Sequence, residues 1–256
     1  MTDGRALLID VGNTRLKWGS LSRGRIERTG SIRLEVLHES GFSALTTRLP
    51  RSPETILVSN VAGPGFAARL ASVLGIHCNV EVHFARSEKS ACGVINSYRQ
   101  PRLLGVDRWV AMIGARAESP SAWCIVDAGT AVTIDALDRT GRHLGGQIIP
   151  GLHAMAQALE SDTSDIGGAG GTGRDPGAGL ELFASTTRQA VRNGSLSAIC
   201  GAVERAVRAM RRGGHRTRIV LTGGDASRIL KQLDGKALHC PHLVLQGLAF
   251  ILQNDS

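Results

Sequence analysis

The chain contains one strand-and-turn pattern twice, and this repeat limits the possible folds more than any other feature. An apolar run ends at Asp10, a Gly-Asn turn follows, and a second apolar run begins a few residues later. The segment from Trp123 to Leu137 has the same layout around Asp127. Short apolar runs separated by tight glycine turns are typical of β-hairpins. Because register and turn chemistry both repeat, a duplicated unit is the economical explanation.

The residues after each hairpin alternate strands with helices, which predicts an α/β fold with two related lobes. The segment ESPS at 118–121 has the composition of a linker, so we assign the lobes to 1–117 and 118–256. Residues 86–104 are expected to be irregular, and the glycine-rich segment 162–179 is expected to form a mobile loop. Apolar spacing and turn residues predict strands at 5–10, 14–21, 24–31, 54–61, 80–84, 123–127, 131–137, 143–150 and 217–224, and helices at 40–49, 65–75, 106–117, 178–211, 225–233, 246–253 and from 152 onward.

Charge and cysteine usage narrow the function class. The net charge of +8 would suit an anionic ligand or nucleic acid, but the only dense basic run, 208–218, lacks the interleaved aromatic residues of single-strand binders. We therefore expect no nucleic-acid partner. The five cysteines show neither CxxC nor zinc-finger spacing, which predicts free thiols in a reducing, cytoplasmic setting. No apolar segment approaches the ~20 residues of a membrane helix.

The repeated turns have the residue types of a phosphate site. Glycine lets backbone N–H groups approach phosphate oxygens, and Asn13 and Thr14 can add side-chain donors. Asp10 and Asp127 would repel phosphate unless a hard cation such as Mg²⁺ lies between the carboxylate and the phosphate. One such turn alone would be only a turn, but a third glycine turn follows at 221–225. No phosphate-binding P-loop motif occurs, so the pattern predicts a nucleoside triphosphate gripped by hairpin turns.

Five ordered segments carry a family resemblance. They are DVGNTRLKWG (10–19), YRQPRLLGVDRW (98–109), DAGTAVTID (127–135), GGQIIPG (145–151) and LTGGDA (221–226). In order and spacing they resemble the motifs of the type III pantothenate kinases, the family that includes the Bvg accessory factor homologues. The resemblance implies two ribonuclease-H-like lobes of the actin, Hsp70 and sugar-kinase superfamily, with the active site in a cleft between the lobes. It also implies ATP-dependent phosphorylation of pantothenate to 4'-phosphopantothenate, the first step of coenzyme A biosynthesis, by a homodimer that uses Mg²⁺ and a monovalent cation, K⁺ or NH₄⁺.

The resemblance also assigns roles to residues. The general base would be Asp107, which would take the proton of the attacking alcohol. Metal ions would be held by Asp10 and Asp127. The pantothenate contacts would be Tyr98, Gly105, Asp107, Arg108 and Thr187. The nucleotide contacts would be Asp10, Gly12, Asn13, Thr14, Lys17, Gly129, Thr130, Thr133, Gly223 and Gly224.

Several residues have an alternative interpretation that the sequence leaves open. Asp107 could be a helix cap, Arg108 could form a surface ion pair, and Lys17 could be a solvated strand residue. Ala184 and Ser185 stand where the family has glycine, which puts the assignment of Thr187 in question. Two other functions also remain: a regulatory, transcription-related protein on the same scaffold, and a kinase for another small alcohol.

Overall fold

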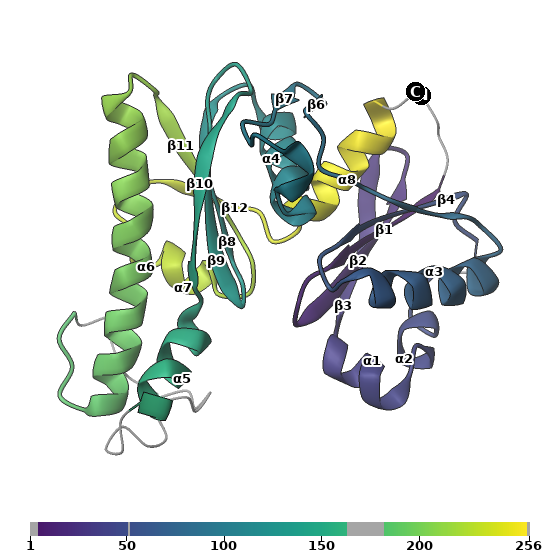
Figure 1. Ribbon diagram of the computed structural model, residues 1–256, viewed down its shortest axis with the longest axis horizontal. Helices are drawn as coiled ribbons and strands as arrows, with labels where there is room; N and C mark the ends of the chain where they lie inside the picture. The colour runs from purple at the N-terminus through teal and green to yellow at the C-terminus, as the bar shows by residue number, and fades with distance from the viewer. Residues whose placement is uncertain (1–4, 51, 163–181, 255–256) are drawn as a thin grey trace. The chain divides into compact units, whose positions relative to one another are not determined.

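The computed structural model describes residues 5–50, 52–162 and 182–254 (Figure 1). The predicted glycine-rich loop at 162–179 lies outside the described residues, apart from its first position. Contacts between Cα atoms divide the chain into two compact units. Unit 1 comprises Met1–Pro120, Thr140–His143 and His242–Ser256, and unit 2 comprises Ser121–Arg139 and Leu144–Pro241.

Unit 1 is built around a five-stranded mixed sheet with the order β3-β2-β1-β4-β5. The first three strands form an antiparallel meander, whereas β4 and β5 run parallel to β1. This is the arrangement that the first hairpin and the following helix-linked strands predict. The elements of unit 1 are β1 (Ala6–Val11), β2 (Arg15–Ser22), β3 (Arg25–Arg33), α1 (Leu34–Ser40), α2 (Ser43–Thr46), β4 (Thr55–Asn60), α3 (Pro64–Cys78), β5 (Val82–Phe84), β6 (Ser90–Ala91), β7 (Val94–Ile95), a 3-10 turn (Pro101–Leu103), α4 (Val106–Glu118) and α8 (Leu243–Asn254).

The two faces of the unit 1 sheet are covered by different helices. On one face, alternate residues such as Ile9 of β1 pack with α1, α2 and α3 in a continuous apolar core. The other face contacts α8, which also packs against α4. Glycine allows this close approach, because a Cβ on Gly114 of α4 would lie 2.5 Å from the Leu243 carbonyl oxygen of α8. The C-terminal helix is therefore part of unit 1.

Unit 2 repeats the sheet of unit 1. Its strand order is β10-β9-β8-β11-β12, with β9 antiparallel to the central β8 and both β11 and β12 parallel to it. The predicted repeat is thus confirmed in sheet order and strand direction. The elements of unit 2 are β8 (Ala122–Ala128), β9 (Ala131–Leu137), β10 (His143–Pro150, whose first residue groups with unit 1), α5 (Leu152–Asp162), α6 (Thr187–Arg212), β11 (Thr217–Thr222), α7 (Ala226–Leu230) and β12 (Ala237–His239).

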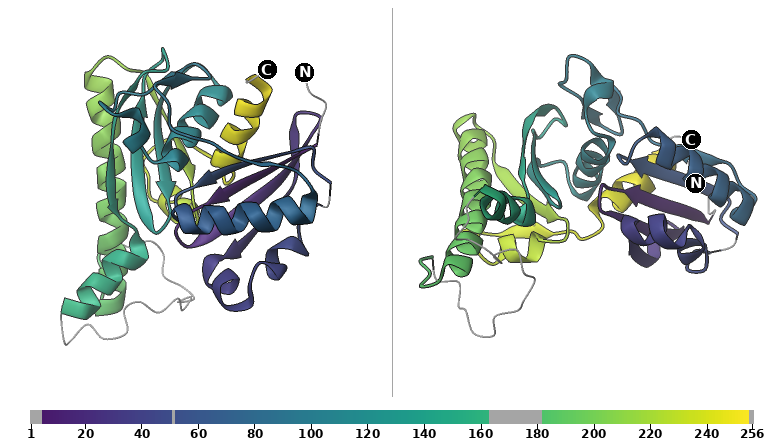
Figure 2. Two further views of the ribbon diagram at one scale, coloured as in Figure 1. Left: turned by 45° about the vertical axis from the view of Figure 1, so that its right-hand side comes forward. Right: turned by 60° about the horizontal axis from the view of Figure 1, so that its bottom comes forward.

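The long helix α6 covers one face of the unit 2 sheet, as Figures 1 and 2 both show. Its apolar side chains, among them Ile199 and Val203, join Cys124 and Val126 of β8 in one buried cluster. Cys124 is completely buried. Burial raises the pKa of its thiol to about 12, with Asp135 nearby as the second cause, so this cysteine serves packing.

The structure departs from the sequence prediction at three places. In the segment 40–49, expected to be one helix, only α2 (Ser43–Thr46) forms, and the helix before it, α1 (Leu34–Ser40), was not predicted. Gly41, whose φ of 71° lies in the left-handed region, ends α1 and separates the two helices. Among the described residues, the helix expected from 178 begins only at Thr187. The C-terminal segment groups with unit 1, although the lobe boundary at 117/118 would place it in the second lobe.

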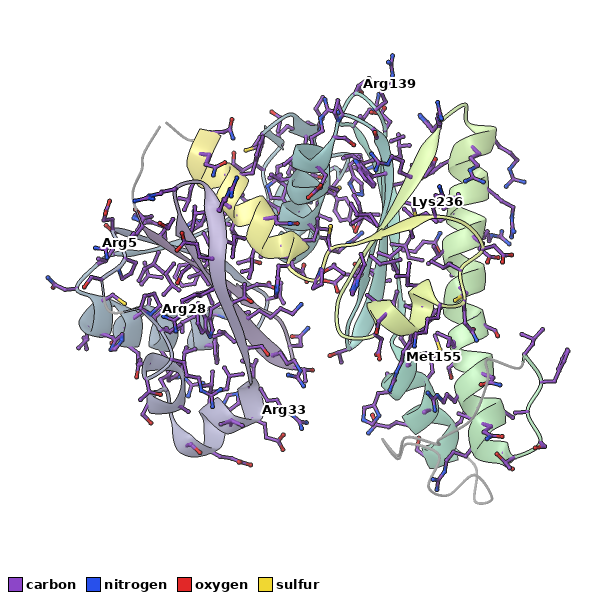
Figure 3. All side chains as sticks on the ribbon, turned by 180° about the vertical axis from the view of Figure 1, so that it is seen from behind. Arg5, Arg28, Arg33, Arg139, Met155 and Lys236 are labelled. Atoms are coloured by element: carbon purple, nitrogen blue, oxygen red, sulfur yellow. The ribbon has the colours of Figure 1, made fainter. Side chains whose placement is uncertain are left out.

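Three composition-based expectations can be compared with the structure. All five cysteines are free, as expected. Among the described residues, no helix is both long enough and apolar enough to cross a membrane. The basic side chains labelled in Figure 3, such as Arg28, Arg139 and Lys236, come from separate strands and turns and are exposed.

Candidate active site

The first predicted phosphate turn joins β1 to β2 in unit 1. Its backbone is closed by the Gly12 N–H, which donates a 3.0 Å hydrogen bond to the Arg15 carbonyl oxygen. Asn13 and Thr14 at the tip are exposed, so their side chains are accessible to a ligand. A Cβ on Gly12 would make only ordinary contact, which means that internal packing does not require glycine there. Glycine does leave the turn's backbone open to an approaching phosphate.

Asp10 lies at the end of β1 in a row of polar side chains. Its neighbours across the sheet are Lys17 on β2 and Ser59 on β4. Residues paired in this way point to the same face of a sheet, so the three side chains are adjacent. Asp10 is 8% exposed and Ser59 is fully buried. The predicted pair of metal-binding carboxylate and phosphate-binding ammonium is therefore adjacent in the structure.

The start of α4 carries the predicted base. Asp107 lies in the first turn of this helix, and its Oδ1 accepts a 2.8 Å hydrogen bond from the backbone N–H of Arg108. The helix cap position is Gly105, with no side-chain cap bond, so Asp107 is not the N-cap that the alternative interpretation proposed. A Cβ on Gly105 would lie 2.7 Å from Asp107 Oδ1. Glycine at this position therefore leaves room for the carboxylate.

Arg108 and Tyr98 meet within unit 1. The Arg108 guanidinium donates a 3.0 Å hydrogen bond to the Tyr98 hydroxyl, and its Cζ lies 5.8 Å from the centre of the Tyr98 ring. The Tyr98 ring stacks on the fully buried His143, with centroids 5.9 Å apart and an interplanar angle of 15°. Arg108 is only 6% exposed, which contradicts the alternative of a surface ion pair. The predicted pantothenate contacts Tyr98, Gly105, Asp107 and Arg108 thus form one cluster.

The second and third phosphate turns come together in unit 2. The Asp225 N–H donates a 3.0 Å hydrogen bond to the Ala128 carbonyl oxygen, which joins the turn after β11 to the turn after β8. Gly223 has a φ of 93°, and a Cβ there would lie 2.5 Å from both the Ala128 carbonyl carbon and Asp127 Oδ1. Gly151 packs equally closely on the Gly129–Thr130 turn. Three glycine-bearing backbone segments therefore form one cradle.

Asp127 has the same place in unit 2 that Asp10 has in unit 1. It pairs with Thr133 on β9 and with Thr222 on β11, so its flanking neighbours are hydroxyls. Gly129 and Thr130 form the tip, where Thr130 is exposed, and Gly224 is exposed beside Gly223. The predicted nucleotide contacts thus fall into two groups, one in each unit. Their convergence on a single ATP remains a prediction.

Thr187, the remaining predicted pantothenate contact, is not part of any of these turns. It is the first residue of α6 and is exposed. The N-cap of the helix is its neighbour Thr186, whose hydroxyl accepts a 3.3 Å hydrogen bond from the Gln189 N–H. Thr187 is therefore accessible, and its predicted role in pantothenate binding stays a prediction.

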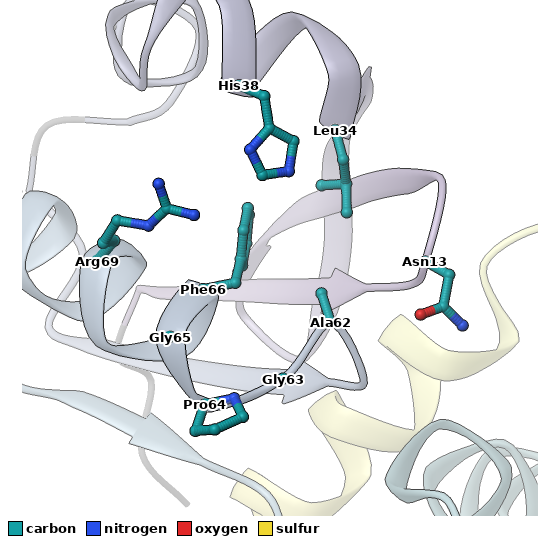
Figure 4. Close-up of a pocket in the computed structure, with 9 residues that line it drawn as sticks. All are labelled: Asn13, Leu34, His38, Ala62, Gly63, Pro64, Gly65, Phe66 and Arg69. Carbon is teal, nitrogen blue, oxygen red and sulfur yellow. The ribbon is translucent and has the colours of Figure 1, made fainter.

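A pocket in unit 1 lies beside the first phosphate turn (Figure 4). Its volume is about 620 Å³, which is within the range of small-molecule sites. Asn13 lines one end, and Gly63, Pro64 and Gly65 at the start of α3 line another part. His38 and Arg69 supply polar and cationic groups at its edge, and both are exposed. The first turn therefore opens into space on its Asn13 side.

The residues present fit a nucleotide with a hydrated cation. Among the described residues, no group of three His, Cys, Asp or Glu side chains forms a complete metal site. Mg²⁺ at a triphosphate needs only one or two carboxylates, because waters and phosphate oxygens fill the other positions. Asp10 supplies such oxygen ligands at the end of β1. A Cβ at Gly223 would meet the Ala128 backbone and Asp127, so this glycine lets the turns after β8 and β11 pack together, and the exposed Gly224 beside it leaves backbone open to a nucleotide.

Comparison with known proteins decides the family. The family model described as type III pantothenate kinase matches residues 6–209. A protein of Nitrosococcus oceani named type III pantothenate kinase is 34% identical, covering 98% of this chain and 94% of its own length. One of the same name from Halorhodospira halophila is 36% identical, covering 94% and 95%. The chain belongs to the type III pantothenate kinase family.

Solved structures support the fold of this family member. A conserved Baf family protein from Campylobacter jejuni, described as a transcriptional activator, superposes with a TM-score of 0.59 at 20% identity and covers 97% of each chain. A protein of Sinorhizobium meliloti described as a 2-dehydro-3-deoxygalactonokinase gives 0.61 at 12% identity, covering 97% and 98%. At these identities the likeness shows the fold alone. It agrees with the predicted α/β fold of two related lobes.

Three residues near the predicted site were not assigned from the sequence. Ser59 completes the row at Asp10, His143 stacks on Tyr98, and Asn96 anchors the segment that carries Tyr98. Each depends on contacts between segments distant in sequence or on complete burial, which no local pattern reveals. The only sequence feature that could have drawn attention to Asn96 was its place two positions before Tyr98, where a recognised motif begins.

Proposed function

We propose that the chain catalyses transfer of the terminal phosphoryl group of ATP to the primary hydroxyl of pantothenate, which forms 4'-phosphopantothenate and begins coenzyme A biosynthesis. The observation that carries the proposal is full-length similarity to type III pantothenate kinases, at 34% identity over 98% of the chain. The chemistry of the site agrees, because it offers a carboxylate, a guanidinium and glycine-rich turns.

Asp107 acts as the general base. Its carboxylate is half-buried at the start of α4 and is held by the Arg108 backbone N–H. In this position it accepts the proton of the pantothenate hydroxyl as that oxygen attacks phosphorus. Arg108 recognises the pantothenate carboxylate, since a planar guanidinium can bind both oxygens of a carboxylate. Tyr98 accepts a hydrogen bond from that guanidinium and keeps its plane in one orientation.

The turns hold the triphosphate. In unit 1, Asn13 and Thr14 donate to phosphate oxygens, and Lys17 stabilises the charge that develops during transfer. In unit 2, Gly223 and Gly224 allow adenosine to lie against the backbone, while Gly129, Thr130 and Thr133 contact phosphate. Mg²⁺, when bound by Asp10, neutralises phosphate charge. Asp127 serves a monovalent cation, K⁺ or NH₄⁺, and the enzyme works as a cytoplasmic homodimer.

The test is a coupled ADP-release assay with pantothenate and a panel of other small alcohols. We expect turnover with pantothenate that requires ATP and Mg²⁺ and rises with K⁺ or NH₄⁺. Asp107→Asn should lower kcat by about 10²- to 10⁴-fold, the usual contribution of a general base, without unfolding the protein. Glu35→Gln is the matched control, because it makes the same change in an exposed surface ion pair with Arg33. Light scattering measures the molar mass of the protein in solution and thereby tests the proposed homodimer.

Three outcomes would contradict the proposal. Wild-type turnover in Asp107→Asn would refute the assignment of the base. Turnover with another alcohol but not with pantothenate would indicate a different small-alcohol kinase. Absence of any kinase activity, together with a binding partner that Asp107→Asn still recognises, would favour the regulatory alternative.

A further inference from the structure

One completely buried asparagine lies at the centre of the irregular segment between β5 and α4. The Asn96 side-chain amide donates hydrogen bonds of 3.1 Å to the Glu88 carbonyl oxygen and 3.2 Å to the Pro101 carbonyl oxygen. Its Oδ1 accepts a 3.0 Å hydrogen bond from the Tyr98 backbone N–H. Both amide hydrogens and the carbonyl oxygen therefore have partners, so the side chain is held in one orientation.

The backbone of Asn96 adds two further bonds to the same segment. Its N–H donates to the Lys89 carbonyl oxygen at 2.9 Å, and its carbonyl oxygen accepts from Lys89 Nζ at 3.3 Å. Regular structure is scarce here, because β6 and β7 pair over only two residues each. One residue thus joins the parts of the segment near 88, 98 and 101. The shape of the segment depends on a polar side chain rather than on a ladder of backbone bonds.

Asparagine at this buried position stabilises the fold less than an apolar side chain would. A buried amide gives up its bonds to water, and an apolar side chain of similar volume would gain burial energy instead. What the amide supplies is directional contact with the backbone on both sides of Tyr98. The backbone position of Tyr98 then determines where its ring and hydroxyl lie.

The fixed tyrosine links Asn96 to the predicted substrate contact. On one side its ring stacks on His143, which is fully buried. The Nδ1 atom of His143 shares a 3.4 Å hydrogen bond with the hydroxyl oxygen of Ser97. On the other side the Tyr98 hydroxyl accepts the 3.0 Å bond from the Arg108 guanidinium. A displacement of the Tyr98 backbone would therefore move the hydroxyl that orients Arg108.

We infer that Asn96 is a positioning residue for recognition of the substrate carboxylate, acting through Tyr98 and Arg108. The inference rests on the proposed function, because the carboxylate is that of pantothenate. Asn96 does not contact the reacting atoms. It determines the direction of the guanidinium, so it governs the affinity for the acidic end of the substrate and leaves the phosphoryl-transfer step unchanged.

The experiment separates this role from general stabilisation. Asn96→Ser should raise KM for pantothenate about tenfold, the order expected for one misaligned charged hydrogen bond, with kcat within about twofold of wild type. An analogue of pantothenate with a hydroxymethyl group in place of the carboxylate lacks the group that Arg108 recognises. Its inhibition constant should therefore differ by no more than about twofold between the wild-type protein and Asn96→Ser. The control Thr217→Val removes another buried side-chain bond, to the His215 carbonyl oxygen in unit 2, and should leave both constants unchanged.

A second variant keeps the inference testable if Asn96→Ser does not fold. Tyr98→Phe retains the ring that stacks on His143 but removes the oxygen that accepts from Arg108, and it should raise KM in the same selective way. If both residues act along one path, the double variant is no worse than the poorer single variant. Multiplied effects, a loss of kcat alone, or equal weakening of the analogue would overturn the inference. A wild-type protein inactive on pantothenate would instead refute the proposed function.

Discussion

Gly223→Ala tests whether the glycine cradle of unit 2 is as tight as the structure indicates. The backbone of Gly223 has a φ of 93°, a conformation that residues with a Cβ rarely adopt. An added methyl group would lie 2.5 Å from the Ala128 carbonyl carbon and 2.5 Å from Asp127 Oδ1. The first of these is backbone at the end of a buried strand, so it cannot move aside as a flexible side chain could.

Two costs add in the folded state. A left-handed conformation with a Cβ costs about 1–2 kcal/mol. Forcing a methyl group into occupied space costs about 1–3 kcal/mol, because neighbouring backbone must shift. We therefore expect Gly223→Ala to lower the free energy of unfolding by about 2–5 kcal/mol, which is a large part of the stability of a typical domain. It should also weaken ATP binding, because the turn after β8 is displaced.

The matched control is the next residue. A Cβ on Gly224 would have nothing within 4 Å, and its φ lies outside the strained region. Gly224→Ala should therefore change the free energy of unfolding by less than about 0.5 kcal/mol. Urea unfolding followed by circular dichroism measures both variants. Equal stabilities for the two variants would refute the argument, since they differ only in conformation and available space.

Two further predictions follow from shifted pKa values. Burial, followed by the nearby Lys17 charge, lowers the pKa of His242, so the unfolded chain binds the proton more readily than the folded chain. Stability should therefore fall as the pH decreases below about 6.5, and His242→Gln should lessen this loss in urea titrations at pH 7.5 and 5.5. Burial raises the pKa of Cys200 to about 11, with Glu204 as the second cause, and that of Cys124 to about 12. A thiol reagent at pH 8 should modify the half-buried Cys92 first and these two only on unfolding, as peptide mass mapping would show.

Much of the fold could be predicted because its signals are local. The two hairpins have alternating apolar runs and glycine turns, and both appear as expected in β1–β2 and β8–β9. The register that makes Asp10 a neighbour of Lys17 follows from the length of the first turn. Helix α4 was predicted almost to the residue, because a glycine precedes it and its apolar spacing is regular.

The remaining features depend on contacts that local patterns do not encode. The break between α1 and α2 is caused by a left-handed glycine inside an otherwise helical pattern. The assignment of α8 to unit 1 depends on glycines in two distant helices, Gly114 and Gly247, which allow close approach. The burial of Asn96 and His143 is also tertiary, so both were passed over beside a motif that was recognised.

The repeat predicts the backbone of the two phosphate turns but not their chemistry. Asp10 and Asp127 occupy equivalent positions at the ends of β1 and β8, and each is flanked by one residue on either neighbouring strand. In unit 1 those flanking residues are Lys17 and Ser59, whereas in unit 2 they are Thr133 and Thr222. The ammonium of Lys17 adds a positive charge that attracts phosphate, while the hydroxyls of Thr133 and Thr222 can only donate or accept hydrogen bonds. The same sheet order therefore supports two turns of different electrostatic character, and this difference arises from substitutions on the strands that flank each aspartate rather than from the glycine turns themselves.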